Sequence, residues 1–254
     1  MLPGAEMWSL GAFVLNHAVL AGAGMVPRWA LLGPNLRRLP VQAAEGAEGA
    51  GEREFVALTF DDGPDPEVTP QVLDLLDAAG ARATFFCIAE RARRHAALTR
   101  EIVARGHSVQ NHSASHRHHF SLLGPRGFER ELGAAQSILA DLSGALPHCF
   151  RAPAGLRNPL LDPVLHRLDL HLVSWTRRGF DTFDGHAQRV LERVARGLAA
   201  RDILLLHDGH ARRDAAGRPV VLDVLPLLLE RLRQAGLATT TLAQAVPRRH
   251  ETAA

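Results

Sequence analysis

Short apolar runs alternate with amphipathic stretches along the chain from Glu54 onward. Short apolar runs bounded by turn residues are typical of buried strands, and apolar residues three and four apart are typical of helices. The sequence therefore predicts strands at 55–60, 83–88, 107–110, 148–151, 170–175, 202–206 and 237–241. It predicts helices at 69–79, 90–105, 127–142, 159–168, 186–200 and 223–234, the last with a proline, Pro226, in its first turn.

This alternation predicts an α/β fold of about seven strands, and periodicity alone fits either a distorted (β/α) barrel or an open doubly wound sheet. The polar residues favour the barrel, because active sites of βα barrels are built from the carboxyl ends of several strands. Polar side chains lie at or just beyond such ends at Asp61, Asp62, His112, His116, Arg151, Asp181, His207 and Asp208.

Composition excludes several classes of protein. The 254 residues are 46% hydrophobic and 22% charged, as in a folded soluble domain. All 29 basic residues are arginine and tyrosine is absent, which excludes a Schiff-base lysine, a P-loop lysine and a catalytic tyrosine. A net charge of +2 gives no basic patch of the kind that nucleic-acid binding needs, so no nucleic-acid partner is expected. Two cysteines form neither a disulfide framework nor a Cys-x-x-Cys motif.

The N-terminal residues 1–40 contain an apolar segment, 7–26, of about the length that spans a bilayer. Asn16 and His17 lie at its centre, and the arginines follow it rather than precede it, which argues against simple secretion. A membrane anchor and a helix packed on the domain both remain open; if the segment spans, the following arginines keep the domain on the cytoplasmic side. Membrane, cell-envelope and cytoplasmic locations of the protein are all compatible with this segment.

The rest of the chain divides into three parts. The composition predicts a linker at 41–53, the main domain at 54–246 and a tail at 247–254.

Two motifs indicate metal chemistry. Asp61 and Asp62 are adjacent carboxylates, which repel each other unless a cation lies beside them; the alternative is a plain Asp-Gly-Pro turn. His112 and His116 are four residues apart, so on a helical turn both would lie on one face and could share an ion. The alternative for the pair is surface or capping residues, and the following His118 and His119 read as rim residues rather than ligands.

Two further residues complete a hydrolytic set. His207 ends a buried strand and could donate a proton to a leaving group, although a lone histidine there is more often structural. Arg151 could pair with a carboxylate of the site, with an ordinary surface ion pair as the competing interpretation.

In order along the chain, the motifs TFDDGP, HSASH, FRAPAG, WTRRGFD and LLLHD resemble those of the polysaccharide deacetylase family, also called the NodB-homology family or carbohydrate esterase family 4. The resemblance covers 54–246 and implies the distorted (β/α) barrel of that family. It implies Asp61 as the catalytic base and His207 as the catalytic acid. It implies Asp62, His112 and His116 as metal ligands.

The same resemblance implies supporting roles. Arg151 would orient the base, Asp181 would support the acid, and Leu205 would line the pocket for the acetyl methyl group. Ala154 stands where the family often has tyrosine, a residue thought to contribute a backbone N–H to the oxyanion. Thr182 replaces a usual tryptophan, so one wall of the sugar site is missing or supplied by Trp175.

The expected function is metal-dependent removal of an N-acyl group, in the first place N-acetyl, from an amino sugar in a polysaccharide or glycoconjugate. The resemblance suggests zinc, and cobalt, nickel or manganese fit the same ligands. One alternative is a deacylase or deformylase of a lipid-linked amino sugar or another amide. An alternative of another class is a catalytically silent carbohydrate-binding module. A carbohydrate is thus the expected partner, and the sequence makes no prediction of oligomeric state.

Overall fold

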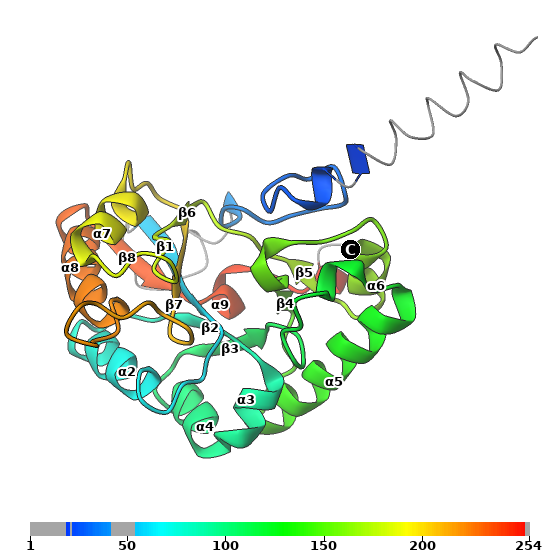
Figure 1. The fold of residues 1–254 in the computed structure, drawn as a ribbon, viewed down its shortest axis with the longest axis horizontal. Coiled ribbons are helices and arrows are strands. Elements are labelled where there is room, and N and C mark those ends of the chain that lie inside the picture. Colours follow the sequence, from blue (N-terminus) through cyan, green and yellow to red (C-terminus); the bar gives the residue numbers. More distant parts are fainter. Residues whose placement is uncertain (1–18, 21, 42–53, 252–254) are drawn as a thin grey trace, which may run out of the picture.

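A curved sheet of parallel strands runs through the molecule, and helices pack on its outer face (Figure 1). The computed structural model describes residues 19–20, 22–41 and 54–251. Across the sheet the strand order is β5-β4-β3-β2-β1-β7-β6, and β8 pairs with the first half of β1. Because the sheet curls round without closing, it forms the distorted barrel that the sequence predicts.

The strands within the described residues are β1 (Glu54–Asp61), β2 (Thr84–Cys87), β3 (Ser108–Asn111), β4 (Cys149–Phe150), β5 (His171–Leu172), β6 (Arg177–Arg178), β7 (Ile203–His207) and β8 (Leu237–Thr240). The helices are α2 (Thr69–Ala78), α3 (Ala89–Arg94), α4 (Ala96–Ala104), α5 (Pro125–Ser143), α6 (Leu161–Arg167), α7 (Ala187–Ala195), α8 (Val221–Gln234) and α9 (Leu242–Ala245).

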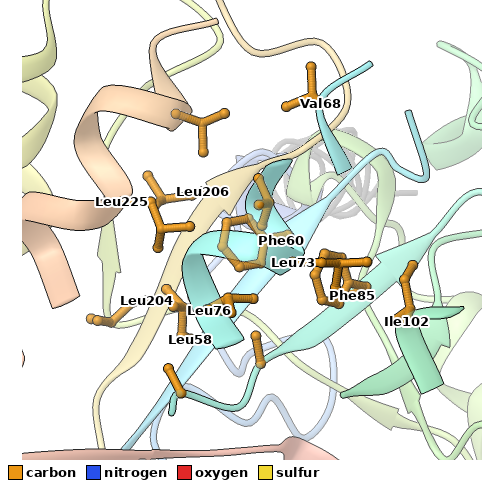
Figure 2. Close-up of a cluster of buried hydrophobic side chains, with 14 of the residues drawn as sticks. Leu58, Phe60, Val68, Leu73, Leu76, Phe85, Ile102, Leu204, Leu206 and Leu225 are labelled. Carbon is orange, nitrogen blue, oxygen red and sulfur yellow. The ribbon is translucent and has the colours of Figure 1, made fainter. Parts of the chain in front are cut away.

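The two central strands, β1 and β7, alternate between an apolar outer face and a more polar inner face. On the outer face, side chains of both strands pack against leucines of α2 and α8, and burying each one contributes about 1.5–3 kcal/mol. Figure 2 shows this cluster, which includes Leu58, Phe60, Leu73, Leu76, Leu204, Leu206 and Leu225. Since side chains alternate with a period of two, Asp61 and His207 point to the inner face instead.

The parallel register of β1 and β7 places Asp61 directly opposite His207. Both are the last residues of their strands, and parallel strands bring their carboxyl ends to one edge of the sheet. The polar strand ends that the sequence singles out therefore meet at one end of the barrel.

Three sequence-based assignments of elements need correction. The helix expected at 90–105 is two helices, α3 and α4, because His95 leaves the helical conformation at φ −117° and ψ 49°. Helix α8 begins at Val221, so Pro226 lies in its second turn and not its first, where proline removes one backbone hydrogen bond. The pair His112 and His116 lies on an irregular turn and not on a helical one, with Ser113 and His116 in the left-handed region.

Two short elements are absent from the sequence-based prediction. Strand β6 has only two residues, which is too short for any periodicity to show. Helix α9 is also short, but it carries a capping box in which Thr241 and Gln244 satisfy each other's backbone N–H groups. This Thr-x-x-Gln signature is the signal that could have predicted α9.

The described part of the N-terminal segment is packed on the barrel. Leu36 accepts a hydrogen bond from Ser174 N–H and donates its own N–H to Leu172 O, while Leu39 N–H donates to Arg201 O. The segment therefore connects the residues around β5 with those just before β7. Most of the expected apolar segment 7–26 lies outside the described residues, and within the described ones no helix is long and apolar enough to cross a membrane.

A substitution of Leu39 tests whether this N-terminal segment contributes to the stability of the domain. Its side chain is fully buried beside Ala57, Val173 and Ile203, so Leu39→Ala should lower the free energy of unfolding by about 2–5 kcal/mol in equilibrium denaturation. Leu31→Ala on the same segment is the control, because Leu31 is 60% exposed and its truncation should cost less than about 0.5 kcal/mol. Equal, small effects of both substitutions would contradict the packing described here.

Candidate functional site

Asp61 at the end of β1 is held by a buried arginine. Arg151 Nη1 donates to Asp61 Oδ1 at 2.6 Å and to Thr59 Oγ1 at 2.8 Å, while its Nη2 donates to Ser174 O at 3.0 Å. The guanidinium also stacks on the ring of Phe86, with Cζ 4.1 Å from the ring centroid. These contacts fix one carboxylate oxygen of Asp61 and leave Oδ2 without a bond to Arg151.

Asp62 follows in the left-handed conformation, at φ 72°, which turns its carboxylate towards two histidines. Its Oδ1 lies 3.2 Å from Nε2 of His112 and 3.2 Å from Nε2 of His116. His112 Nδ1 lies 2.8 Å from Arg151 O, so this nitrogen donates and leaves the Nε2 lone pair directed at Asp62.

These three residues offer a metal site. Their ligand atoms all lie within 4.8 Å of one another. Asp62 Oδ1 is buried and has no hydrogen-bond partner, which is costly unless a cation or a proton lies beside it. Two imidazoles and one carboxylate leave coordination positions open, as in catalytic zinc sites, whose tetrahedral ligand atoms stand roughly 3.3 Å apart. The residues therefore fit a divalent cation.

The protonation of the same residues follows from burial and charge. Burial opposes ionisation of Asp62, but the neighbouring imidazoles of His112 and His210 outweigh it and hold the pKa of Asp62 well below its usual range. Burial lowers the pKa of His116 to about 4, so this imidazole is neutral at pH 7 and free to bind a cation. Burial acts in the same direction on His112, but Asp61 and Asp62 outweigh it and raise the pKa of His112.

His207 and Asp181 form a second hydrogen-bonded pair in the site. Asp181 is fully buried, and its two oxygens accept from His207, Oδ1 from Nδ1 at 2.9 Å and Oδ2 from the backbone N–H at 2.7 Å. Burial disfavours the charged ring, but Asp181 outweighs burial and raises the pKa of His207. The ring is thus oriented through one nitrogen, and His207 lines the cavity described next.

One cavity of about 190 Å³ is lined by Asp61, Asp62, His112, His116 and His207, whereas Arg151 and Asp181 lie behind it. The further residues that the sequence singled out also line it: Leu205, Trp175 and Ala154, the last in the left-handed region at φ 54°. His118 and His119 are exposed and do not line it. A larger cavity of 620 Å³ lies beside His107 and His148, but the described residues that line it include no carboxylate.

Three residues of this cavity are not predicted from the sequence. His210 Nδ1 lies 3.2 Å from Asp62 Oδ2, on the side away from the histidine pair. Phe183, 75% exposed, lies next to Thr182 and supplies an aromatic wall beside Trp175. Arg178 of β6 also lines the cavity. His210 stands two residues beyond the LLLHD motif, which is the only sequence signal for it. Arg178 lies within the WTRRGFD motif and Phe183 two residues after it, but the motif alone does not predict that these side chains line the cavity.

Comparison with known proteins gives consistent matches. The model of the family described as polysaccharide deacetylase matches residues 48–173. A peptidoglycan-N-acetylglucosamine deacetylase of Bacillus cereus is 29% identical over 205 residues, covering 80% of this chain and 93% of the relative. A chitooligosaccharide deacetylase of Sinorhizobium fredii is 33% identical over 195 residues, covering 74% and 90%. The structure of a family 4 carbohydrate esterase from Streptomyces lividans in complex with acetate is similar at TM-score 0.68 and 30% identity, covering 77% and 96%.

A substitution of Gly209, in the loop after β7, tests the assignment of Asp62 to the cation site, because this loop packs directly against the Asp62 backbone. A Cβ added at Gly209 would lie 2.5 Å from the carbonyl oxygen of Asp62, so Gly209→Ala must displace that residue. We expect divalent-cation binding, measured by calorimetry with zinc or cobalt, to weaken about tenfold or more, the equivalent of ~1.4 kcal/mol. Gly133→Ala in α5 is the control, since a Cβ there meets nothing within 4 Å. Unchanged affinity in Gly209→Ala would contradict the assignment of Asp62 to the cation site.

Asp208 predicts a pH dependence of stability. Burial raises the pKa of Asp208 to about 7, despite the hydrogen bond from Thr69 Oγ1 at 2.6 Å. The folded state therefore holds a proton that the unfolded chain releases above about pH 4, so stability falls as the pH rises through this interval. The test measures the free energy of unfolding of metal-free wild type and of metal-free Asp208→Asn at each pH. The wild-type value minus the Asp208→Asn value should fall by up to about 1.4 kcal/mol per pH unit between pH 5 and 7. Parallel stability profiles of the two proteins would contradict the raised pKa.

Proposed function

The chain belongs to the polysaccharide deacetylase family and is a hydrolase of carbon–nitrogen bonds other than peptide bonds, and we propose that it removes N-acetyl groups from amino sugars in a polysaccharide or glycoconjugate. The catalytic domain is proposed to span 54–246, with 1–40 as an attached hydrophobic segment, 41–53 as a linker and 247–254 as a tail. The substrates named for the relatives, peptidoglycan and chitooligosaccharides, are the first to test.

One observation carries this proposal. A three-residue cation site lies in one small cavity with two separately held proton-transfer groups, Asp61 and His207, on neighbouring strands. Hydrolysis of an amide needs all three: activation of water, a base for its proton and an acid for the leaving amine.

We assign Asp62, His112 and His116 as the ligands of a divalent metal, with zinc as the proposed ion. Cobalt, nickel and manganese are compatible with the same donor atoms. When bound, the metal lowers the pKa of water and stabilises negative charge on the carbonyl oxygen of the substrate.

Asp61 is assigned as the base. Because Arg151 and its neighbours hold Oδ1, the second oxygen, Oδ2, is the one able to accept the proton of the attacking water. Oδ2 lies 4.0 Å from Nε2 of His112, so it faces the proposed ligand set. Arg151 thereby acts on the reaction through the orientation of Asp61.

His207 is assigned as the acid. Asp181 fixes Nδ1, which leaves Nε2 to protonate the departing amine, and it stabilises the charged ring that this step requires. Asp181 itself is buried and acts only through His207.

Three further residues are assigned to substrate binding. Leu205 gives an apolar wall for the acyl methyl group, and Trp175 gives an aromatic wall for the sugar. Ala154 is assigned to the carbonyl oxygen, towards which its backbone N–H would donate in the transition state. Its left-handed conformation, which turns the peptide plane, supports this assignment.

A lipid-linked amino sugar is a second candidate substrate. The described N-terminal segment exposes large apolar side chains, with Met25 73%, Trp29 51% and Leu31 60% exposed. An exposed apolar patch is typical of a surface that meets a membrane or a lipid chain. Deacylation or deformylation of such a substrate would use the same catalytic groups.

The proposal is tested by release of acetate or formate from the purified protein, stripped of metal and reloaded with zinc, cobalt or nickel. Substrates are chitooligosaccharides, peptidoglycan fragments and lipid-linked amino sugars. His112→Ala should lose metal binding and turnover together, because it removes a ligand. Asp61→Asn should bind metal as the wild type does and lose at least about a hundredfold in kcat, because it removes only the base.

The variants also identify which part of the proposal fails. An active His112→Ala protein without bound metal would refute the metal site. Full turnover by Asp61→Asn would refute its role as base and leave the ligand assignment standing. Bound metal with no release from any substrate class would favour a silent carbohydrate-binding module.

A further inference from the structure

Arg178 is a cationic side chain in the active-site cavity that the proposed reaction does not use. It belongs to β6, a strand at the edge of the sheet (Figure 1). Its side chain lines the same cavity as the cation site. Its Cζ lies over three aromatic rings, 5.4 Å from the centroid of Trp175, 4.9 Å from Phe180 and 5.9 Å from Phe183. Aromatic faces attract the charge of a guanidinium but accept none of its N–H groups well.

Among the residues that the structure describes, Arg178 has no carboxylate partner. Its Nε is buried and has no hydrogen-bond acceptor. The adjacent Arg177, by contrast, donates through Nε to Asp202 at 2.6 Å. The difference lies in direction: Arg177 faces a buried carboxylate, and Arg178 faces the cavity.

The two acids that line the cavity, and the buried Asp181 behind it, are already paired with other groups. Asp61 is bound by Arg151, Asp62 lies among three histidines, and Asp181 accepts two hydrogen bonds from His207. Each of these pairings serves the proposed chemistry, so none of the acids is available to Arg178. A buried guanidinium N–H without an acceptor, such as Arg178 Nε–H, is unfavourable, and an acceptor from the substrate removes that cost.

We propose that Arg178 is a specificity-determining residue that binds an anionic group, carboxylate or phosphate, on the amino-sugar substrate. This inference rests on the proposed deacetylase function and goes beyond it by naming the charge of the substrate. The planar guanidinium matches the two oxygens of a carboxylate or a phosphate group. The rings around it reduce water access and so strengthen the attraction between the two charges.

The same rings suit the uncharged part of such a substrate. Phe180 and Phe183 are 46% and 75% exposed, which is unusual for side chains that only fill a core. Phe180 is also held in the left-handed region, at φ 60°, a conformation that bulky residues rarely adopt. Their exposure beside Arg178 leaves aromatic surface for the apolar face of a sugar ring next to an anion site.

The experiment compares pairs of substrates in which one member carries an anionic group and the other carries a neutral group at the same position. A muramic-acid-containing oligomer with a free lactyl carboxylate is compared with its methyl ester, and N-acetylglucosamine 1-phosphate with the methyl glycoside. Wild-type zinc-loaded protein should favour the anionic member of at least one pair about tenfold or more in kcat/KM, through KM. The pair that shows the preference identifies whether carboxylate or phosphate is the natural anion.

Arg178→Met tests the residue itself, because methionine keeps an apolar stem against the rings and removes the charge. It should reduce the preference to within about twofold, raise KM for the anionic member, and leave kcat on the neutral member within about twofold. Arg178→Lys should retain part of the preference, since lysine keeps the positive charge but cannot donate two parallel hydrogen bonds to one anion as a guanidinium can. Arg189→Met is the control: it removes the same charge on α7, where Arg189 pairs with Asp184, and should keep the full preference.

Failure of this inference is distinguishable from failure of the proposed function. An unchanged preference in Arg178→Met, or no preference in the wild type, would overturn the role of Arg178 while leaving deacetylation intact. If metal-loaded protein hydrolyses none of the substrates, the proposed function fails, and binding of the same pairs is then measured by calorimetry. Selective binding of the anionic member that Arg178→Met loses would support the anion site, and equal binding by both proteins would overturn it.

Discussion

The buried ion pair between Arg151 and Asp61 connects most of the parts of this site. The guanidinium reaches from the end of β4 across the barrel interior to β1, and its Nε and Nη2 donate to carbonyl oxygens of Val173 and Ser174 beyond β5. The backbone oxygen of the same residue faces His112 Nδ1. One residue thus orients the proposed base, one proposed metal ligand and the chain after β5. Removal of one partner of such a buried pair leaves an uncompensated charge, at a cost of about 3–5 kcal/mol.

The arrangement works because each central strand has two different faces. Outward side chains of β1 and β7 form the apolar cluster with α2 and α8, which holds the sheet against its helices. Inward side chains are then available for chemistry at the carboxyl ends, where Asp61 and His207 are register partners. The two proposed proton-transfer groups therefore owe their proximity to strand pairing, and each is oriented by its own buried partner, Arg151 for Asp61 and Asp181 for His207.

The charged side chains in and around the cavity are of two kinds: those paired with other groups of the protein, and Arg178, which is not. The carboxylates and histidines form hydrogen-bonded pairs or a cation site, in which burial and neighbouring charges set the pKa values of Asp62, His112 and His116. Arg178 stands outside these pairs, among aromatic rings and facing the cavity. The proposed catalytic groups and the residue proposed to bind the anion of the substrate are therefore different side chains of one small cavity. Arg178 can be substituted without changing any of the proposed catalytic groups.

The amino-acid sequence by itself determined the alternation of strands and helices, the barrel and the family, because apolar periodicity and short ordered motifs are local properties of the chain. The candidate residues Asp61, Asp62, His112, His116 and His207 also follow from those motifs, and the structure brings them to one cavity. Sequence spacing failed for the histidine pair, since four residues suggested a helical turn where left-handed residues make an irregular one. It also failed for His210, Phe183 and Arg178, and for the packing of 36–39 between β5 and β7. Only the tertiary structure decided these. His210 meets Asp62 across 148 residues of chain, and 36–39 contact strands far along the sequence. Arg178 and Phe183 are close in the sequence to the rings beside them, but the pairing of β6 with β7 decides that the Arg178 side chain faces the cavity.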